Sequence, residues 1–113
     1  IGIIPYFGYA RQDVQHRQGE SVSATVVVHF LEAVGFYKIY TIDIHDEATG
    51  GVFAIPFKNL SAMALLAEKV GQYLGRIDRR KIAIASPDQG GIKRAREFGY
   101  YLFGDSNFNL TVI

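Results

Sequence analysis

Three carboxylates and one histidine stand close together directly after an apolar run in the first half of the chain. They are Asp43, His45, Asp46 and Glu47. Alternate residues of an extended chain face the same side, so Asp43 and His45 are predicted to lie together while Ile44 points the other way. Hard oxygen ligands suit Mg²⁺, which usually keeps several waters and substrate oxygens. The pattern is typical of a cation site, and a solvated turn after a strand is the alternative.

A second polar segment, Ser86–Arg96, reads SPDQGGIKRAR and joins a predicted strand to a predicted helix. The glycines at positions 90 and 91 let backbone amides approach an anionic ligand, and a helix N-terminus adds partial positive charge. Their spacing matches neither a P-loop nor a dinucleotide-binding fingerprint. A phosphate-binding turn and a plain strand-to-helix turn with a solvated basic face both fit this segment.

A third segment, Tyr6–Arg17, reads YFGYARQDVQHR. Aromatic rings interleaved with Arg11, Gln12 and Arg17 can stack on a base and pair with phosphates. The alternative is a polar surface loop with scattered tyrosines. His29 falls among apolar residues of a predicted helix and is interpreted as structural.

The elements that must position these groups are predicted from apolar runs and from helical spacing. Strands are expected at residues 1–4, 36–42, 81–85 and 110–113. The expected helices are one capped by Ser21 or Ser23 and ended by Gly35, one capped by Asn59 or Ser61 and ended by Gly75, and one over Ile92–Leu102. Alternating strands and helices indicate an α/β fold with a mostly parallel sheet. Ligands bind at the carboxyl edge of such sheets, where the polar clusters fall.

Composition sets the broad class of protein. The chain has 113 residues, almost half of them hydrophobic, and a formal net charge of +1, which gives no indication of a nucleic-acid or membrane partner. It has no cysteine, which excludes disulfides and thiolate metal sites and favours a cytoplasmic setting. No apolar run approaches the roughly 20 residues that span a bilayer. The chain begins inside an apolar run without Met, so we expect an internal segment of a longer protein.

Five segments together resemble the ribose-phosphate diphosphokinase family, also called phosphoribosyl pyrophosphate synthetases. They read IPYFGYARQD at 4–13, GESVSA at 19–24, TIDIH at 41–45, IPFKNLSA at 55–62 and SPDQGGIKRAR at 86–96. Their order and spacing are those of the family, and the resemblance covers essentially the whole chain. It implies transfer of a diphosphoryl group from MgATP to the C1 hydroxyl of ribose 5-phosphate, which gives phosphoribosyl pyrophosphate and AMP.

The resemblance also implies a cofactor, an assembly and residue roles. The cofactor is Mg²⁺ and the assembly is a homo-oligomer with a phosphoribosyltransferase-type (type I) fold. Residues 1–58 correspond to the latter part of an N-terminal phosphoribosyltransferase-like domain, and residues 59–113 to the beginning of a C-terminal one. The assigned residues are Arg11, Gln12 and Asp13 in the ATP loop, Asp43 and His45 at the metal with His45 catalytic, and Asp88, Gly90 and Gly91 on the ribose phosphate side.

The chain departs from the family's pattern after the TIDIH segment. Ala48 and Gly50 stand where the family has glutamines, and Ala54 and Lys58 where it has metal-associated aspartates. An ammonium in place of a carboxylate reverses the sign of an interaction of about 4 kcal/mol at about 4 Å in an effective dielectric of about 20. The alternative function is a non-catalytic synthetase-associated subunit with a regulatory or structural role. A segment of this length is not expected to be active alone.

Overall fold

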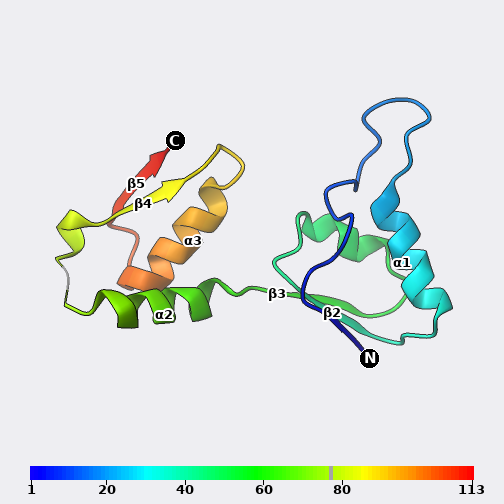
Figure 1. Ribbon diagram of the computed structural model, residues 1–113, viewed down its shortest axis with the longest axis horizontal. Coiled ribbons are helices and arrows are strands. Elements are labelled where there is room, and N and C mark those ends of the chain that lie inside the picture. Colours follow the sequence, from blue (N-terminus) through cyan, green and yellow to red (C-terminus); the bar gives the residue numbers. More distant parts are fainter. Residues whose placement is uncertain (77) are drawn as a thin grey trace. The chain divides into compact units, whose positions relative to one another are not determined.

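Strand β2 (Ile39–Ile42) is the middle strand of a parallel sheet, between β1 (Gly2–Ile4) and β3 (Phe57–Leu60) (Figure 1). In its register Thr41 lies opposite Ile4 on one side and Asn59 on the other. The computed structural model describes residues 1–76 and 78–113. Within them this sheet belongs to unit 1, Ile1–Ser61, and unit 2 is Ala62–Ile113.

Helix α1 (Ser23–Ala33) lies between β1 and β2 in the chain. The prediction of a serine cap is wrong, because Val22 is the N-cap residue and α1 begins without a capping side-chain hydrogen bond. The hydroxyls of Ser21 and Ser23 instead lie 3.4 Å from each other. The predicted end at Gly35 is confirmed, since this residue adopts φ +97°, where a side chain is strained.

The core of unit 1 draws on loops as well as on helix and strand. Its buried hydrophobic residues are Phe7, Ala10, Val28, Leu31, Ile39, Ile44 and Phe53. The ring of Phe7 meets those of Phe53 and Phe57 edge to face, at centroid distances of 6.0 and 6.2 Å, and Phe53 stacks on Phe57 at 4.6 Å. Aromatic pairs of this kind add to the free energy of burial. The loop after β1 is therefore fixed to the core through Phe7.

Two short elements of unit 1 differ from the prediction. A 3-10 helix, η1 (Glu47–Val52), follows the polar residues after β2. Strand β3 was not predicted, because it is short and alternates half-buried with exposed residues instead of forming an apolar run. Asn59 consequently lies in β3 and is not a helix cap.

Unit 2 has a parallel pair of strands, β4 (Ala83–Ser86) and β5 (Asn109–Val112), linked by helix α3 (Ile92–Phe103). Helix α2 (Met63–Leu74) precedes them and ends, as predicted, at Gly75 with φ +61°. The predicted α/β class with parallel strands is confirmed, and the described strands form two parallel sheets, one in each unit. No helix within residues 1–76 and 78–113 is long and apolar enough to cross a membrane.

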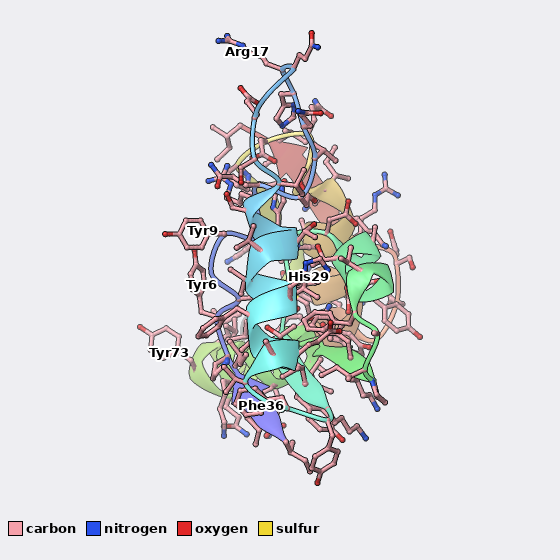
Figure 2. All side chains as sticks on the ribbon, turned by 90° about the vertical axis from the view of Figure 1, so that its right-hand side faces the viewer. Tyr6, Tyr9, Arg17, His29, Phe36 and Tyr73 are labelled. Carbon is pink, nitrogen blue, oxygen red and sulfur yellow. The ribbon has the colours of Figure 1, made fainter. Side chains whose placement is uncertain are left out.

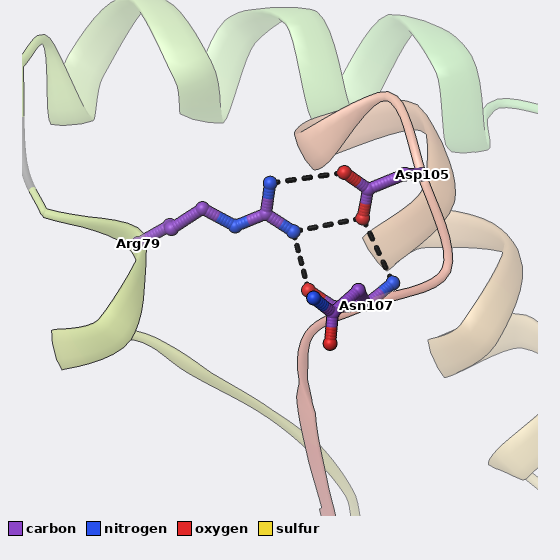
Figure 3. A network of polar contacts seen from close by, with 3 residues as sticks. All are labelled: Arg79, Asp105 and Asn107. Atoms are coloured by element: carbon purple, nitrogen blue, oxygen red, sulfur yellow. Dashed lines mark hydrogen bonds and ion pairs between the residues drawn. The ribbon is translucent and has the colours of Figure 1, made fainter.

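Arg79, in the 3-10 helix η2 (Arg79–Lys81), joins this turn to the loop between α3 and β5 (Figure 3). Its Nη1 and Nη2 donate to the two carboxylate oxygens of Asp105 at 3.0 and 2.8 Å, and Nη2 also donates to the carbonyl oxygen of Asn107. The guanidinium lies 5.2 Å from the centre of the Phe103 ring. The hydrogen bond from Arg79, followed by that from the Asn107 amide, lowers the pKa of Asp105 to about 2.

This lowered pKa predicts a pH-dependent contribution to stability. Because the pKa of Asp105 is about 2 in the folded chain and about 3.9 in an unfolded one, its stabilisation is complete above about pH 4 and is lost as the pH falls toward 2. We expect the thermal midpoint to fall less steeply from pH 5 to pH 2 in Asp105→Asn than in the wild type, as calorimetry of the full-length protein will show. Arg79→Lys keeps the positive charge but loses the paired hydrogen bonds of the guanidinium to Asp105. Its thermal midpoint is expected to depend on pH less than that of the wild type and more than that of Asp105→Asn. The same pH dependence in wild type and Asp105→Asn would contradict the assignment.

Candidate functional site

The parallel sheet of unit 1 brings two of the polar clusters to one edge. The strands β1 and β2 run in the same direction, with Ile4 and Thr41 opposite each other near their carboxyl ends. The loop after β1, residues 5–22, and the turn after β2, residues 43–46, therefore leave from the same edge of neighbouring strands. The loop that contains Arg11–Asp13 and the turn that contains Asp43 and His45 thus start from one edge of the sheet.

The turn after β2 has an unusual backbone at its first residue. Asp43 adopts φ +45°, a left-handed conformation that Asp tolerates better than most residues. Its amide donates to the carbonyl of Leu60 at 2.9 Å, and the amide of Ile44 donates to Oδ1 of Asn59 at 3.0 Å. The Ile44 side chain is buried in the core, whereas Asp43 is half-buried and His45 is exposed. Ile44 thus points into the core and away from the exposed His45, as predicted. Strand alternation is not the reason, because β2 buries Ile39 and Thr41 and would expose residue 44 if it continued; the left-handed Asp43 reverses the pattern.

The two acidic residues that follow are engaged in local structure. Oδ1 of Asp46 accepts from the Ala48 amide at 2.8 Å and so caps η1. Oε1 of Glu47 lies 3.5 Å from Nδ2 of Asn59. In the part of the chain that the structure describes, no group of three or more Asp, Glu, His or Cys side chains is arranged to hold a metal.

The loop after β1 has a fixed base and exposed polar side chains. Tyr9 adopts φ +63°, and its backbone carbonyl accepts from the Gln12 amide at 2.9 Å. The carbonyl of Gln12 in turn accepts from the amide of Ala24 at 3.2 Å. Arg11 and Gln12 are exposed and Asp13 is half-buried. Figure 2 shows the rings of Tyr6 and Tyr9 projecting outward on one side of the loop. Two aromatic rings and a guanidinium are thus presented to solvent from a short stretch.

The far end of this loop is organised by Glu20, which the sequence analysis did not single out. Its Oε2 accepts from the amides of His16 and Arg17 at 3.2 and 3.1 Å. Arg17 lies at the tip of the loop, and His29 is an exposed residue of α1 (Figure 2). The exposure of His29 means that it makes no contribution to the core.

The segment after β4 in unit 2 forms a closed turn. The buried Ser86 hydroxyl donates to the carbonyl of Asp88 at 2.7 Å, and Oδ1 of Asp88 accepts from the Gly91 amide at 2.7 Å. A Cβ at Gly91 would lie 2.5 Å from the Ser86 hydroxyl oxygen, so this position accepts only glycine without rearrangement. Since the Gly91 amide is bonded to Asp88, anion binding through it requires that carboxylate to move.

The departures from the family's pattern have local structural counterparts. A Cβ at Gly50 would lie 3.0 Å from the ring of Phe57, so a glutamine there would press on the aromatic cluster. The amide of Ala54 donates to Oε1 of Glu32 at 2.6 Å. Lys58 is exposed, and the alternation along β3 puts it on the face opposite Asn59.

Comparison with known proteins places these features in a family. A family model described as the N-terminal domain of ribose phosphate pyrophosphokinase matches residues 1–35. Ribose-phosphate pyrophosphokinases from Thermosipho africanus and Ureaplasma parvum are 38% and 42% identical to the chain, over 90% and 84% of its length and 32% and 28% of theirs. The enzyme from Methanothermobacter thermautotrophicus is 40% identical over 83% of this chain and 31% of its own. The chain thus spans about a third of the length of these curated relatives.

The fold agrees with the sequence similarity. The crystal structure of phosphoribosylpyrophosphate synthetase from Mycobacterium smegmatis matches 98% of this chain and 35% of its own, with a TM-score of 0.84 and 31% identity. The chain therefore has an α/β fold of the type I phosphoribosyltransferase kind. Over the segment that it spans, it belongs to the ribose-phosphate pyrophosphokinase family.

The closed turn after β4 predicts different tolerance at two adjacent glycines. Gly91→Ala is expected to lower the free energy of unfolding by about 1–3 kcal/mol, because the methyl group overlaps the buried Ser86 hydroxyl. Gly90→Ala is the matched control, since its Cβ would lie 3.4 Å from Oδ1 of Asp88, an ordinary contact. Urea unfolding of both variants measures the difference. Equal losses in the two would show that the Ser86 contact does not restrict this turn.

Proposed function

We propose that the full-length protein containing this chain is a ribose-phosphate diphosphokinase, which transfers the diphosphoryl group of ATP to the C1 hydroxyl of ribose 5-phosphate. The observation that supports the proposal is the shared carboxyl edge of β1 and β2, from which both the loop that contains Arg11–Asp13 and the turn that contains Asp43 and His45 leave. The sequence similarity to enzymes with this name supports it over a non-catalytic associated subunit.

The residues at this edge fit a magnesium ion carried by the nucleotide. Mg²⁺ is usually held by one or two carboxylates together with waters and substrate phosphate oxygens, so a cage of three or more protein ligands is not required. Asp43 supplies a half-buried carboxylate at the end of β2, and His45 is an exposed neighbour on the same turn. We therefore assign Asp43 and His45 to the metal region, with Asp43 as the oxygen ligand. Bound Mg²⁺ would neutralise charge on the transferred phosphates.

The chain's own groups position the reactants and accept a proton. The C1 hydroxyl oxygen attacks the β-phosphorus of ATP, the bond from that phosphorus to the α,β-bridging oxygen breaks, and AMP leaves. The hydroxyl proton passes to His45, because imidazole is the commonest side chain in this role. Arg11 pairs with the nucleotide phosphates, while Gln12 and Asp13 complete the ATP loop.

The remaining assignments extend this proposal. Asp88, Gly90 and Gly91 belong to the ribose phosphate side, where the turn after β4 meets the start of α3. Residues 1–58 are the latter part of one phosphoribosyltransferase-like domain, and residues 59–113 are the beginning of a second. The protein acts as a homo-oligomer.

The role of His45 can be tested against a second exposed histidine. In the full-length protein, His45→Ala is expected to lower kcat for AMP formation from ATP and ribose 5-phosphate by about 10²-fold or more, the range of a lost general base. His29→Ala, on α1, is the control and is expected to stay within about 2-fold of the wild type, as surface substitutions away from a site usually do. The assigned role is wrong if His45→Ala keeps the wild-type rate.

A further inference from the structure

The hydrogen-bond ladder between β2 and β3 stops at the turn that carries Asp43 and His45. The last ladder-like bond runs from the Asp43 amide to the carbonyl of Leu60 at 2.9 Å. With Asp43 at φ +45°, the chain turns away from β3, and the next amide, that of Ile44, bonds to no strand carbonyl. It donates instead to the side-chain oxygen of Asn59 at 3.0 Å, a bond between residues 15 positions apart.

The Asn59 amide is oriented by a contact at each end. Its oxygen accepts from Ile44, and its nitrogen lies 3.5 Å from the carboxylate oxygen of Glu47. A donor facing Glu47 and an acceptor facing the Ile44 amide agree with one orientation of the amide only. Asparagine meets both requirements, whereas an aspartate in this position would set two carboxylates against each other.

We propose that Asn59 is a positioning residue for the Asp43 and His45 pair in the transfer reaction, an inference that rests on the function proposed above. Ile44 is held at two points, by its side chain in the core and by its amide on Asn59. The residues on either side of Ile44 are consequently restricted in the direction that they present to the edge of the sheet. Left-handed residues such as Asp43 persist where their surroundings fix them, and Asn59 supplies part of that restraint.

The test compares variants of the full-length protein at a temperature where each is fully folded. Asn59→Ala removes the acceptor and is expected to lower kcat for AMP formation by about 10- to 100-fold, with KM for ATP and ribose 5-phosphate within about 2-fold, because misplaced catalytic groups lower the rate far more than binding. Amide hydrogen exchange at Ile44 should become at least about 10-fold faster, as expected when a protecting bond is lost.

A matched control and a rescue separate positioning from general loosening. Glu32→Ala removes another side-chain acceptor in unit 1, the one bonded to the Ala54 amide, and should leave kcat and Ile44 exchange unchanged. Asn59→Asp alone should be impaired by repulsion from Glu47. The double variant E47Q/N59D reverses the donor and the acceptor of the pair and is expected to recover kcat to within about 3-fold of the wild type, because paired substitutions in contact are not additive.

The outcomes distinguish this inference from the proposed function. The positioning role is overturned if Asn59→Ala leaves kcat and Ile44 exchange unchanged, or if Glu32→Ala lowers kcat as much as Asn59→Ala does. It is also overturned if E47Q/N59D does not recover kcat. If the wild-type protein forms no AMP, the proposed function fails. Exchange at Ile44 then decides by itself whether Asn59 holds the turn, and unchanged exchange overturns that too.

Discussion

The pairing of β2 with β1 and β3 is the constraint on which the rest of unit 1 depends. Because all three strands are parallel, whatever follows β1 and β2 leaves at one edge. The strand β2 ends at Ile42 and is followed by a left-handed residue, Asp43. Strand β3 accepts from the next two backbone amides, that of Asp43 through the Leu60 carbonyl and that of Ile44 through the Asn59 side chain. The loop after β1 is fixed to the core by Phe7, and the turn after β2 is fixed to the same core by Ile44.

The sequence predicted the features that depend on local pattern. The helix ends at Gly35 and Gly75 follow from the freedom of glycine at positive φ. The burial of Ile44 depends instead on the left-handed Asp43, which reverses the alternation of buried and exposed residues along β2. Strand β3 was not predicted because it is only four residues long and its half-buried residues alternate with exposed ones. The role of Asn59 was missed for a different reason: its partner lies 15 positions away, so only tertiary structure brings the two together.

Two of the departures from the family's pattern, Gly50 and Lys58, can be followed in the structure. Gly50 leaves room for Phe57, whose ring belongs to the aromatic cluster with Phe7 and Phe53. The sign reversal introduced by Lys58 requires its ammonium to lie near the metal region, but its side chain projects from the face of β3 opposite Asn59. Neither departure therefore opposes the catalytic function proposed for the full-length protein, and the names of the relatives support that proposal over an associated subunit.

Transfer of a diphosphoryl group by the full-length protein is the function proposed above. The most direct measurement incubates the full-length protein with Mg²⁺, ribose 5-phosphate and ATP labelled in its γ-phosphate, and identifies the products. We expect AMP in an amount equal to the ribose 5-phosphate consumed, with the label retained in phosphoribosyl pyrophosphate. Formation of ADP, release of the label as inorganic phosphate, or no ribose-dependent turnover would contradict it.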